Sequence, residues 1–178
     1  MPSDVIDRKV TYLLELCDQN GDGLLEVSDF EMWIERMAAI RGWERGSADY
    51  AGLEALFLDA YKGMQAAYAN PDGRIEIAAM KDTLVAMAAA GAPELGEWGD
   101  GFFRLIDADG DGVIARQEYR DLMASVFIDA AVADDAFARL DTNGDGVISA
   151  DEFTQLYRDF FTSDDPDAPG SRFWGSFE

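Results

Sequence analysis

The chain has 178 residues and a net charge of −22, from 36 acidic and 14 basic residues. This charge disfavours nucleic acid and anionic membrane surfaces as partners, because both are also negative. Hydrophobic residues make up 48% of the chain, so it can bury a sizeable core and is not a disordered acidic tail.

The chain contains no histidine and only one cysteine. The lack of histidine excludes histidine-based acid–base and nucleophile chemistry and most zinc and copper sites, so we expect no enzyme. The single cysteine, Cys17, cannot form an internal disulfide. It ends an apolar pattern, which indicates a small core residue rather than a redox thiol.

The N-terminal sequence MPSDVIDRKV has no basic segment followed by an apolar run, so we expect no signal peptide. Pro2 stands where an N-myristoylation signal needs glycine. No apolar stretch approaches transmembrane length. We therefore expect a cytoplasmic protein that is not inserted in a membrane.

The first predicted helix covers residues 4–17, with Ser3 as its N-cap, and runs directly into DQNGDGLLEVSD, residues 18–29. This segment, loop one, has the spacing of a twelve-residue calcium loop. Gly23 at position 6 permits the sharp turn that folds such a loop around an ion. The predicted ligands of loop one are Asp18, Asn20, Asp22, Leu24 through its carbonyl, Glu26 and Asp29.

Position 12 of loop one differs from the common pattern, because it carries Asp29 where glutamate is usual. Aspartate is one methylene shorter, so it would reach the ion through one oxygen and lower the coordination number toward six. Mg²⁺ requires octahedral geometry with six ligands, so loop one favours Mg²⁺ as an alternative to Ca²⁺ more than the other intact loops do. Glu26 at position 9 can compensate by binding directly.

The next predicted helices cover residues 27–41 and, after an N-cap at Ser47, residues 48–68. The apolar face of the second helix includes Leu53, Leu56 and Phe57.

The following turn, loop two (residues 68–79), resembles a calcium loop that has lost its metal. Its register puts Tyr68 at position 1 and Ala79 at position 12, and Pro71 further alters the loop. We expect Ile75 at position 8 to pair with Leu25 in a short antiparallel bridge to loop one.

A helix over residues 77–90 ends at Gly91, and the next is predicted over residues 94–106, with Pro93 before it and Leu95 and Trp98 on its apolar face. It enters DADGDGVIARQE, residues 107–118, or loop three. This loop alone has carboxylates at all of positions 1, 3, 5 and 12. The predicted ligands of loop three are Asp107, Asp109, Asp111, Val113 through its carbonyl, and Glu118.

Helices predicted over residues 116–127 and 130–140 lead to DTNGDGVISADE, residues 141–152, or loop four. Ile114 and Ile148 occupy equivalent positions, so loops three and four should pair as well. A final helix is predicted to about residue 161. The predicted ligands of loop four are Asp141, Asn143, Asp145, Val147 through its carbonyl, and Glu152.

These loops start at residues 18, 68, 107 and 141, which is an internal repeat of helix–loop–helix units, the EF-hand. The predicted fold is all-α and compact: four EF-hands in two paired lobes, with short β-bridges between paired loops. The predicted lobes are residues 1–90 and 91–161. Three intact loops imply three Ca²⁺ ions, and we expect a monomer whose target protein, if any, the sequence does not identify.

Residues 162–178 form a tail in which a polar linker is followed by Phe173, Trp174 and Phe177. We predict that this aromatic tail packs on the lobes and fills the groove between them. The alternative is a frayed terminus that is merely hydrophobic.

The pattern of loops one, three and four intact and loop two degenerate resembles the group of sarcoplasmic calcium-binding proteins and calerythrins. The wide gap between loops one and two and the ending DDPDAPGSRFWGSF are also similar to this group. The resemblance implies a compact helical protein with three calcium sites that buffers or transports Ca²⁺. Calcium-regulated photoproteins share the loop pattern, but their luminophore chemistry uses histidine, which this chain lacks.

Three functions remain open from the sequence. A buffer needs only the sites, whereas a sensor opens an apolar, often methionine-rich groove for a target protein when Ca²⁺ binds. The seven methionines are scattered, which with the aromatic tail favours a buffer. A purely structural protein with vestigial loops would bind no Ca²⁺.

Overall fold

The computed structural model describes residues 4–91 and 99–177. Four expectations lie outside these residues: the N-cap at Ser3, the helix start at Pro93, and the apolar positions Leu95 and Trp98.

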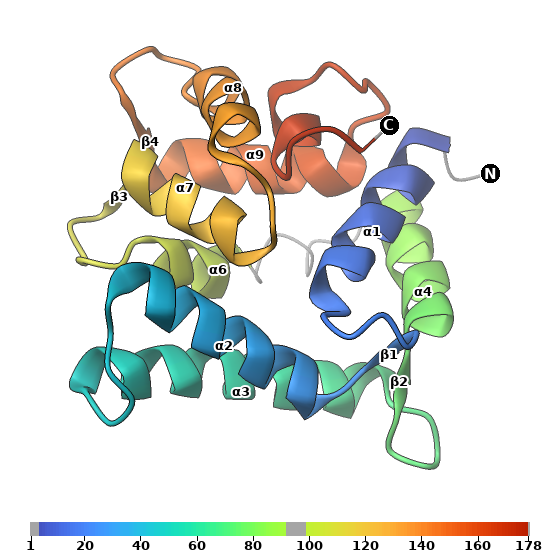
Figure 1. Cartoon of the computed structure of the whole chain (residues 1–178). Coiled ribbons are helices and arrows are strands. Elements are labelled where there is room, and N and C mark those ends of the chain that lie inside the picture. Colours follow the sequence, from blue (N-terminus) through green and yellow to red (C-terminus); the bar gives the residue numbers. More distant parts are fainter. Residues whose placement is uncertain (1–3, 92–98, 178) are drawn as a thin grey trace.

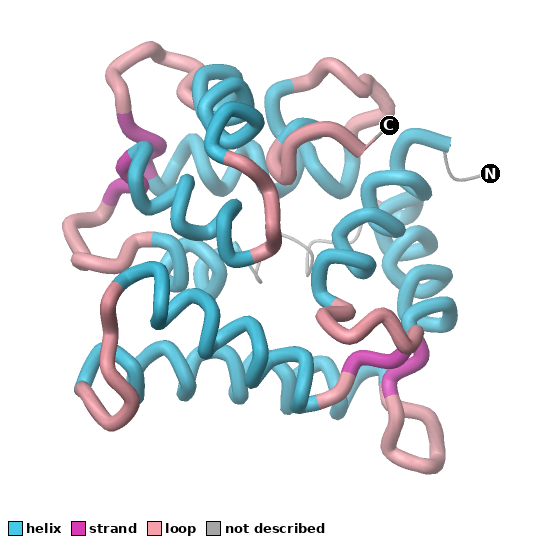
Figure 2. The backbone as a smooth tube through the Cα atoms, in the orientation of Figure 1, coloured by secondary structure: helices cyan, strands magenta, loops and turns pink. Residues whose placement is uncertain are grey.

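The described chain is mostly helical, with two pairs of very short strands, which confirms the all-α class (Figures 1 and 2). Its first half contains α1 (Asp4–Cys17), β1 (Leu24–Leu25), α2 (Val27–Arg41), α3 (Ala48–Tyr68), β2 (Ile75–Glu76) and α4 (Ile77–Ala90). Its second half contains α6 (Gly99–Ile106), β3 (Val113–Ala115), α7 (Arg116–Ser125), α8 (Ala130–Leu140), β4 (Val147–Ser149), α9 (Ala150–Thr162) and the 3₁₀ helix η1 (Pro169–Arg172). None of the described helices is long and apolar enough to cross a membrane.

The loops are joined in pairs by the two strand pairs. β1 runs antiparallel to β2 with Leu25 opposite Ile75, and β3 runs antiparallel to β4 with Ile114 opposite Ile148. All four side chains are buried. Both predicted bridges are confirmed, so loop one faces loop two and loop three faces loop four.

Helices from both halves of the chain share one core. α1 packs beside α4, and α2 packs beside α3 (Figure 1). α2 also packs on α7, while α1 and α4 contact α9. Cys17 lies against this core, and burial raises the pKa of its thiol to about 12, which fits the predicted structural role.

Local sequence sets where several helices begin and end. The hydroxyl of Ser47 accepts a hydrogen bond from the backbone N–H of Tyr50 at 3.1 Å, as expected of an N-cap. Gly42 ends α2 in the left-handed region, with φ at 70°.

The predicted helix over residues 116–127 is two residues too long, because α7 ends at Ser125. Phe127 adopts a left-handed φ of 64° and is 75% exposed. The guanidinium of Arg36 lies 3.7 Å from the centre of its ring, so this aromatic side chain contacts a cation instead of the core. Leu56, expected on the apolar face of α3, is also exposed, because Tyr50, Leu53 and Phe57 form the buried side.

The aromatic side chains of the tail are buried. The ring of Phe173 contacts those of Phe102, Tyr119 and Phe153, with centroids 5.5 to 6.1 Å apart. Its carbonyl accepts a hydrogen bond from the Tyr119 hydroxyl. Trp174 lies beside Trp33 and Phe102, so the tail contacts side chains from both halves of the chain.

A buried lysine ties α1 to the end of α9 and to the tail. The Lys9 ammonium donates to the carbonyls of Asp159 and Ser163 at 3.2 and 2.9 Å, and to the hydroxyl of Ser171 at 3.0 Å. Burial lowers the pKa of Lys9 to about 8, against the opposing effect of the nearby Asp159 and Asp164 charges. Lys9 therefore remains charged at neutral pH and can donate to all three acceptors.

Gly170 provides a test of this packing. A Cβ there would lie 2.3 Å from the Leu156 carbonyl oxygen and 2.6 Å from the Asp159 Cβ, both on α9. We predict that Gly170→Ala lowers the free energy of unfolding by about 1–3 kcal/mol, because the tail must move away from α9. Urea unfolding followed by circular dichroism measures this change.

The matched control is Gly63→Ala, on an exposed turn of α3 where an added Cβ meets nothing within 4 Å. This variant should be as stable as the parent or more stable by up to about 1 kcal/mol, because alanine favours a helix. Equal stability of the two variants would show that the tail does not pack on α9 in solution.

Candidate metal-binding loops

Loops one, three and four share a frame of hydrogen bonds centred on the carboxylate at position 1. In loop three, Asp107 accepts the backbone N–H groups of Gly110, Asp111 and Gly112 at 2.9 to 3.1 Å. The same three positions donate to Asp18 in loop one and to Asp141 in loop four. Each position-1 carboxylate is thus held by hydrogen bonds from its own loop.

The side chains at positions 3 and 5 continue this frame. Each accepts the backbone N–H two residues further on, which is an Asx turn. In loop three, Asp109 accepts from Asp111 at 3.1 Å, and Asp111 accepts from Val113 at 3.0 Å. The equivalent pairs in loops one and four have distances of 2.8 to 3.1 Å.

The residue at position 12 reaches back across the loop from the helix that follows it. One oxygen of Glu118 accepts the N–H of Ala108 at 2.8 Å, and the other accepts the N–H of Ala115 at 2.8 Å. In loop four, Glu152 accepts the N–H of Asn143 at position 3 through one oxygen, at 3.3 Å, and the N–H of Ser149 at position 9 through the other, at 3.1 Å. The position-12 carboxylate therefore faces the loop interior in both cases.

Asp29 makes the same connections in loop one despite its shorter side chain. Its carboxylate accepts the N–H groups of Gln19, Asn20 and Glu26 at 2.9 to 3.3 Å, and the residue is fully buried. Burial raises the pKa of Asp29, and the Asp18 charge adds to this, while the three N–H groups oppose it.

Glu152 differs in its electrostatics. Partial burial raises the pKa of this carboxyl, but hydrogen bonds from Ser149, Thr142 and Asn143 outweigh burial and hold it below its usual value. Loops one and four thus stabilise their position-12 charges to different degrees.

The carboxylates of loop three are close enough to share one ion. Ligand oxygens of Asp107, Asp109 and Glu118 all lie within 4.8 Å of one another. Ca²⁺–oxygen distances are about 2.4 Å, so oxygens on opposite sides of one Ca²⁺ lie about 4.8 Å apart. This all-oxygen donor set fits a hard divalent cation.

Loop two closes on itself instead. The side-chain oxygen of Asn70 accepts the N–H groups of Asp72 and Arg74 at 3.0 and 3.1 Å, and its amide nitrogen donates to Glu76. Position 4 explains why the loop differs. Loops one, three and four have glycine there, with φ between 72° and 76°. Proline cannot adopt a positive φ, so Pro71 prevents the same path.

Sequence analysis missed the importance of position 4. The glycines there, Gly21, Gly110 and Gly144, are visible in the sequence as G-D-G in each intact loop. Their left-handed backbone brings the N–H groups of positions 4, 5 and 6 toward the position-1 carboxylate.

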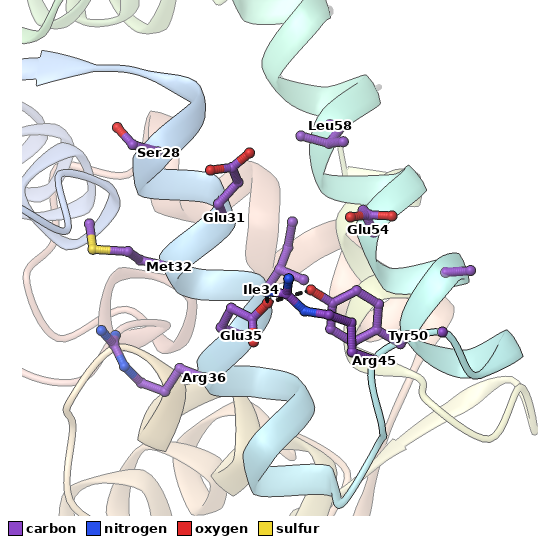
Figure 3. A pocket seen from close by; sticks show the side chains of 12 residues that line it. Ser28, Glu31, Met32, Ile34, Glu35, Arg36, Arg45, Tyr50, Glu54 and Leu58 are labelled. Carbon is purple, nitrogen blue, oxygen red and sulfur yellow. Dashed lines mark hydrogen bonds and ion pairs between the residues drawn. The ribbon is translucent and has the colours of Figure 1, made fainter.

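A groove of about 910 Å³ lies between α2 and α3 (Figure 3). At its centre the Tyr50 hydroxyl donates to Glu35 at 2.6 Å, and Arg45 pairs with the same oxygen. The Tyr50 hydrogen bond, together with Arg45, lowers the pKa of Glu35. Because Glu35, Tyr50 and Arg45 bond to one another, they connect α2 to α3 across the groove and are not presented as reactive side chains.

Comparison with known proteins relates two of the loops to a known family. A family model described as EF hand matches residues 99–123 and 133–157, which contain the whole of loops three and four. The alpha-B and -A chains of a sarcoplasmic calcium-binding protein from Penaeus sp. are 27% identical over 143 residues, 74% of this chain and 73% of the relative. The beta chain from Penaeus sp. is 29% identical over 141 residues, with the same coverage of both chains.

Solved structures agree on the fold. A coelenterazine-binding protein from Renilla muelleri has a TM-score of 0.82 and 22% identity, covering 96% of this chain and 95% of its own. A sarcoplasmic calcium-binding protein from amphioxus has a TM-score of 0.74 and 20% identity, covering 99% of both chains. A calcium-binding protein from Streptomyces coelicolor has a TM-score of 0.70 and 22% identity, covering 88% of this chain and 98% of its own. The chain therefore has homologues among the sarcoplasmic calcium-binding proteins, and its second half matches the EF-hand model.

Proposed function

We propose that the protein binds three Ca²⁺ ions, at loops one, three and four, and acts as a cytoplasmic, monomeric calcium buffer rather than an enzyme. The observation that supports this most directly is the frame of hydrogen bonds common to the three loops, which turns carboxylates from both ends of each loop toward its interior. The proposed ligands are Asp18, Asn20, Asp22, Leu24, Glu26 and Asp29 in loop one, Asp107, Asp109, Asp111, Val113 and Glu118 in loop three, and Asp141, Asn143, Asp145, Val147 and Glu152 in loop four.

Electrostatics favours uptake of cations. Carboxylates within 4.8 Å of one another repel, and the excess of negative charge over the whole chain adds to this repulsion. Each divalent ion removes two negative charges, so three ions would change the net charge from −22 to −16. Binding to the folded state should therefore stabilise it.

The buried tail supports buffering over sensing. A sensor needs an apolar groove that becomes available to a target when Ca²⁺ binds. Here Trp174 contacts aromatic side chains of both halves, Trp33 and Phe102, and Phe173 contacts Phe102. The alternative, a sensor that opens for a target protein, is favoured by the Streptomyces coelicolor neighbour, whose structure is described as a basis for calcium-mediated regulation.

Titration calorimetry tests the three sites. We predict that the parent protein binds three Ca²⁺ ions and that Glu118→Gln and Glu152→Gln each bind one fewer, because each loses a charged position-12 ligand. The control is Asp151→Asn, one residue before Glu152 and exposed, which should retain all three. Unchanged stoichiometry in either glutamine variant would refute the assignment of that loop.

Asp29→Glu tests the ion preference of loop one. The longer side chain can bind through two oxygens, so we predict a higher ratio of Ca²⁺ to Mg²⁺ affinity at this loop. Calorimetry with Ca²⁺ in the presence and absence of millimolar Mg²⁺ measures the ratio. A ratio equal to that of the parent would show that the length of the position-12 side chain does not set the preference.

An apolar dye separates buffer from sensor. A protein covered by its own tail should bind less dye after Ca²⁺ is added, whereas a sensor should bind more. We predict less dye binding for the full chain and more for a variant lacking residues 171–178, whose absence uncovers Phe102, Tyr119 and Trp33. Circular dichroism confirms that the shortened chain is folded, and a calcium-induced rise in the full chain would favour the sensor.

A further inference from the structure

α2 leaves loop one and also makes polar contacts with the helices on either side of loop three. Arg41, at its last turn, donates to the carbonyls of Leu105 and Ile106 at 3.3 and 3.2 Å. These are the last two residues of α6, immediately before Asp107. The carbonyls at a helix end lack partners within the helix, so a guanidinium with two donors caps them.

The other end of the loop-three unit is held by the same helix. One nitrogen of Arg36 donates to the Ser125 carbonyl at 2.6 Å and also to the side chain of Gln19. The indole N–H of Trp33 donates to the buried Ser125 hydroxyl at 2.7 Å. Ser125 ends α7, which follows loop three, and Gln19 is position 2 of loop one. Arg36 therefore contacts both calcium-loop units directly.

α2 is also the helix that carries Asp29, the position-12 residue of loop one. Asp29 is fully buried and bonded to the backbone of Gln19, Asn20 and Glu26, so the first turn of α2 is fixed to loop one. Arg41 lies twelve residues further on, or about 18 Å along a helix with a rise of 1.5 Å per residue. Any shift of Asp29 toward an ion is thus transmitted along a rigid helix to α6.

From these contacts we infer that Arg36 and Arg41 are positioning residues for the loop-three site and couple it to the site in loop one. This inference rests on the proposed calcium binding. Loop two offers no carboxylate at position 1 or 12, so the β1–β2 bridge connects loop one to no second ion. One route from loop one to another ion runs through α2 to loop three, and from there through β3–β4 to loop four.

The charge of Arg41 and its hydrogen bonds to α6 have opposite effects on Ca²⁺ binding in loop three. Burial lowers the pKa of this guanidinium, and the Glu118 and Asp121 carboxylates oppose that effect. A cation facing Glu118 by itself disfavours a bound Ca²⁺, whereas the cap on α6 holds the start of loop three in place. Replacing arginine with lysine keeps the charge and removes the two-pronged cap, so Arg36→Lys and Arg41→Lys isolate positioning from charge.

The experiment uses NMR of protein labelled with ¹⁵N-glycine during titration with CaCl₂. Gly23, Gly112 and Gly146 occupy position 6 of loops one, three and four, so their amide signals report each site separately. Asp18→Ala disables loop one. We expect this change to weaken Ca²⁺ binding at Gly112 by about fivefold or more in the parent, the lower end of typical coupling between sites.

In the Arg36→Lys/Arg41→Lys background, Asp18→Ala should weaken Ca²⁺ binding at Gly112 by a much smaller factor than in the parent, because the contacts of the two arginines are lost. Arg45→Lys is the matched control: Arg45 pairs with Glu35 in the α2–α3 connection, so the effect of Asp18→Ala should persist. A lysine variant that only destabilises the fold would lower the Ca²⁺ affinities reported by Gly112 and by Gly146 alike. It would preserve the effect of Asp18→Ala. If the double variant does not fold, the single lysine variants are used.

The outcomes separate this inference from the function on which it rests. If Gly112 responds to Ca²⁺ but Asp18→Ala leaves its affinity unchanged in the parent, the coupling is refuted and calcium binding stands. If the effect of Asp18→Ala is as large in the lysine background as in the parent, the two arginines do not carry it. If none of the three glycines responds to Ca²⁺, both proposals fail.

A second measurement uses the metal-free protein and follows amide hydrogen exchange at Asp107. The N–H of Asp107 donates to the carbonyl of Phe103 at 2.9 Å, and it should exchange faster in Arg41→Lys than in the parent.

Discussion

The contact between each position-1 carboxylate and the backbone N–H groups of positions 4, 5 and 6 is the interaction on which the loops depend. Asp18, Asp107 and Asp141 each accept these three donors, which gathers negative charge inside a tight turn. That crowding would be unfavourable without a cation, so one local feature explains the shape of the loops and why a divalent ion would be favoured inside them. Loop two shows the converse, because Pro71 at position 4 removes the turn and the polar groups satisfy one another.

The four helix–loop–helix units are joined into one body by contacts that their own sequences do not reveal. Lys9 ties α1 to the end of α9 and to Ser171 of the tail, and Tyr119 donates to the backbone of Phe173. Arginines of α2 contact α6 and α7 in the same way. A buried lysine, a buried tyrosine hydroxyl or a partly buried arginine makes the polar contact at each of these junctions. These connections suit a protein that stores ions more than one that exposes a groove.

Local patterns in the sequence predicted well wherever the partner lies a fixed number of residues away. The bridges between Leu25 and Ile75 and between Ile114 and Ile148 follow from the register of the loops, and Ser47 caps α3 as its neighbours dictate. Helical periodicity was less reliable at the edges of the apolar faces. Leu56 and Phe127 belong to apolar patterns but are exposed, because the number of neighbours around each face decides which side chains are buried.

The sequence by itself determined the EF-hand units, the degenerate second loop and the candidate ligands, because all groups that shape one loop lie within twelve residues of each other. Only the tertiary structure decided that Asp29 is buried with its carboxylate bonded to the loop backbone, that the tail aromatics lie between the two halves, and that α2 holds the ends of α6 and α7. The last two arrangements join residues about 60 to 140 positions apart. At such separations the geometry of packing selects the partners, and spacing in the sequence carries no signal.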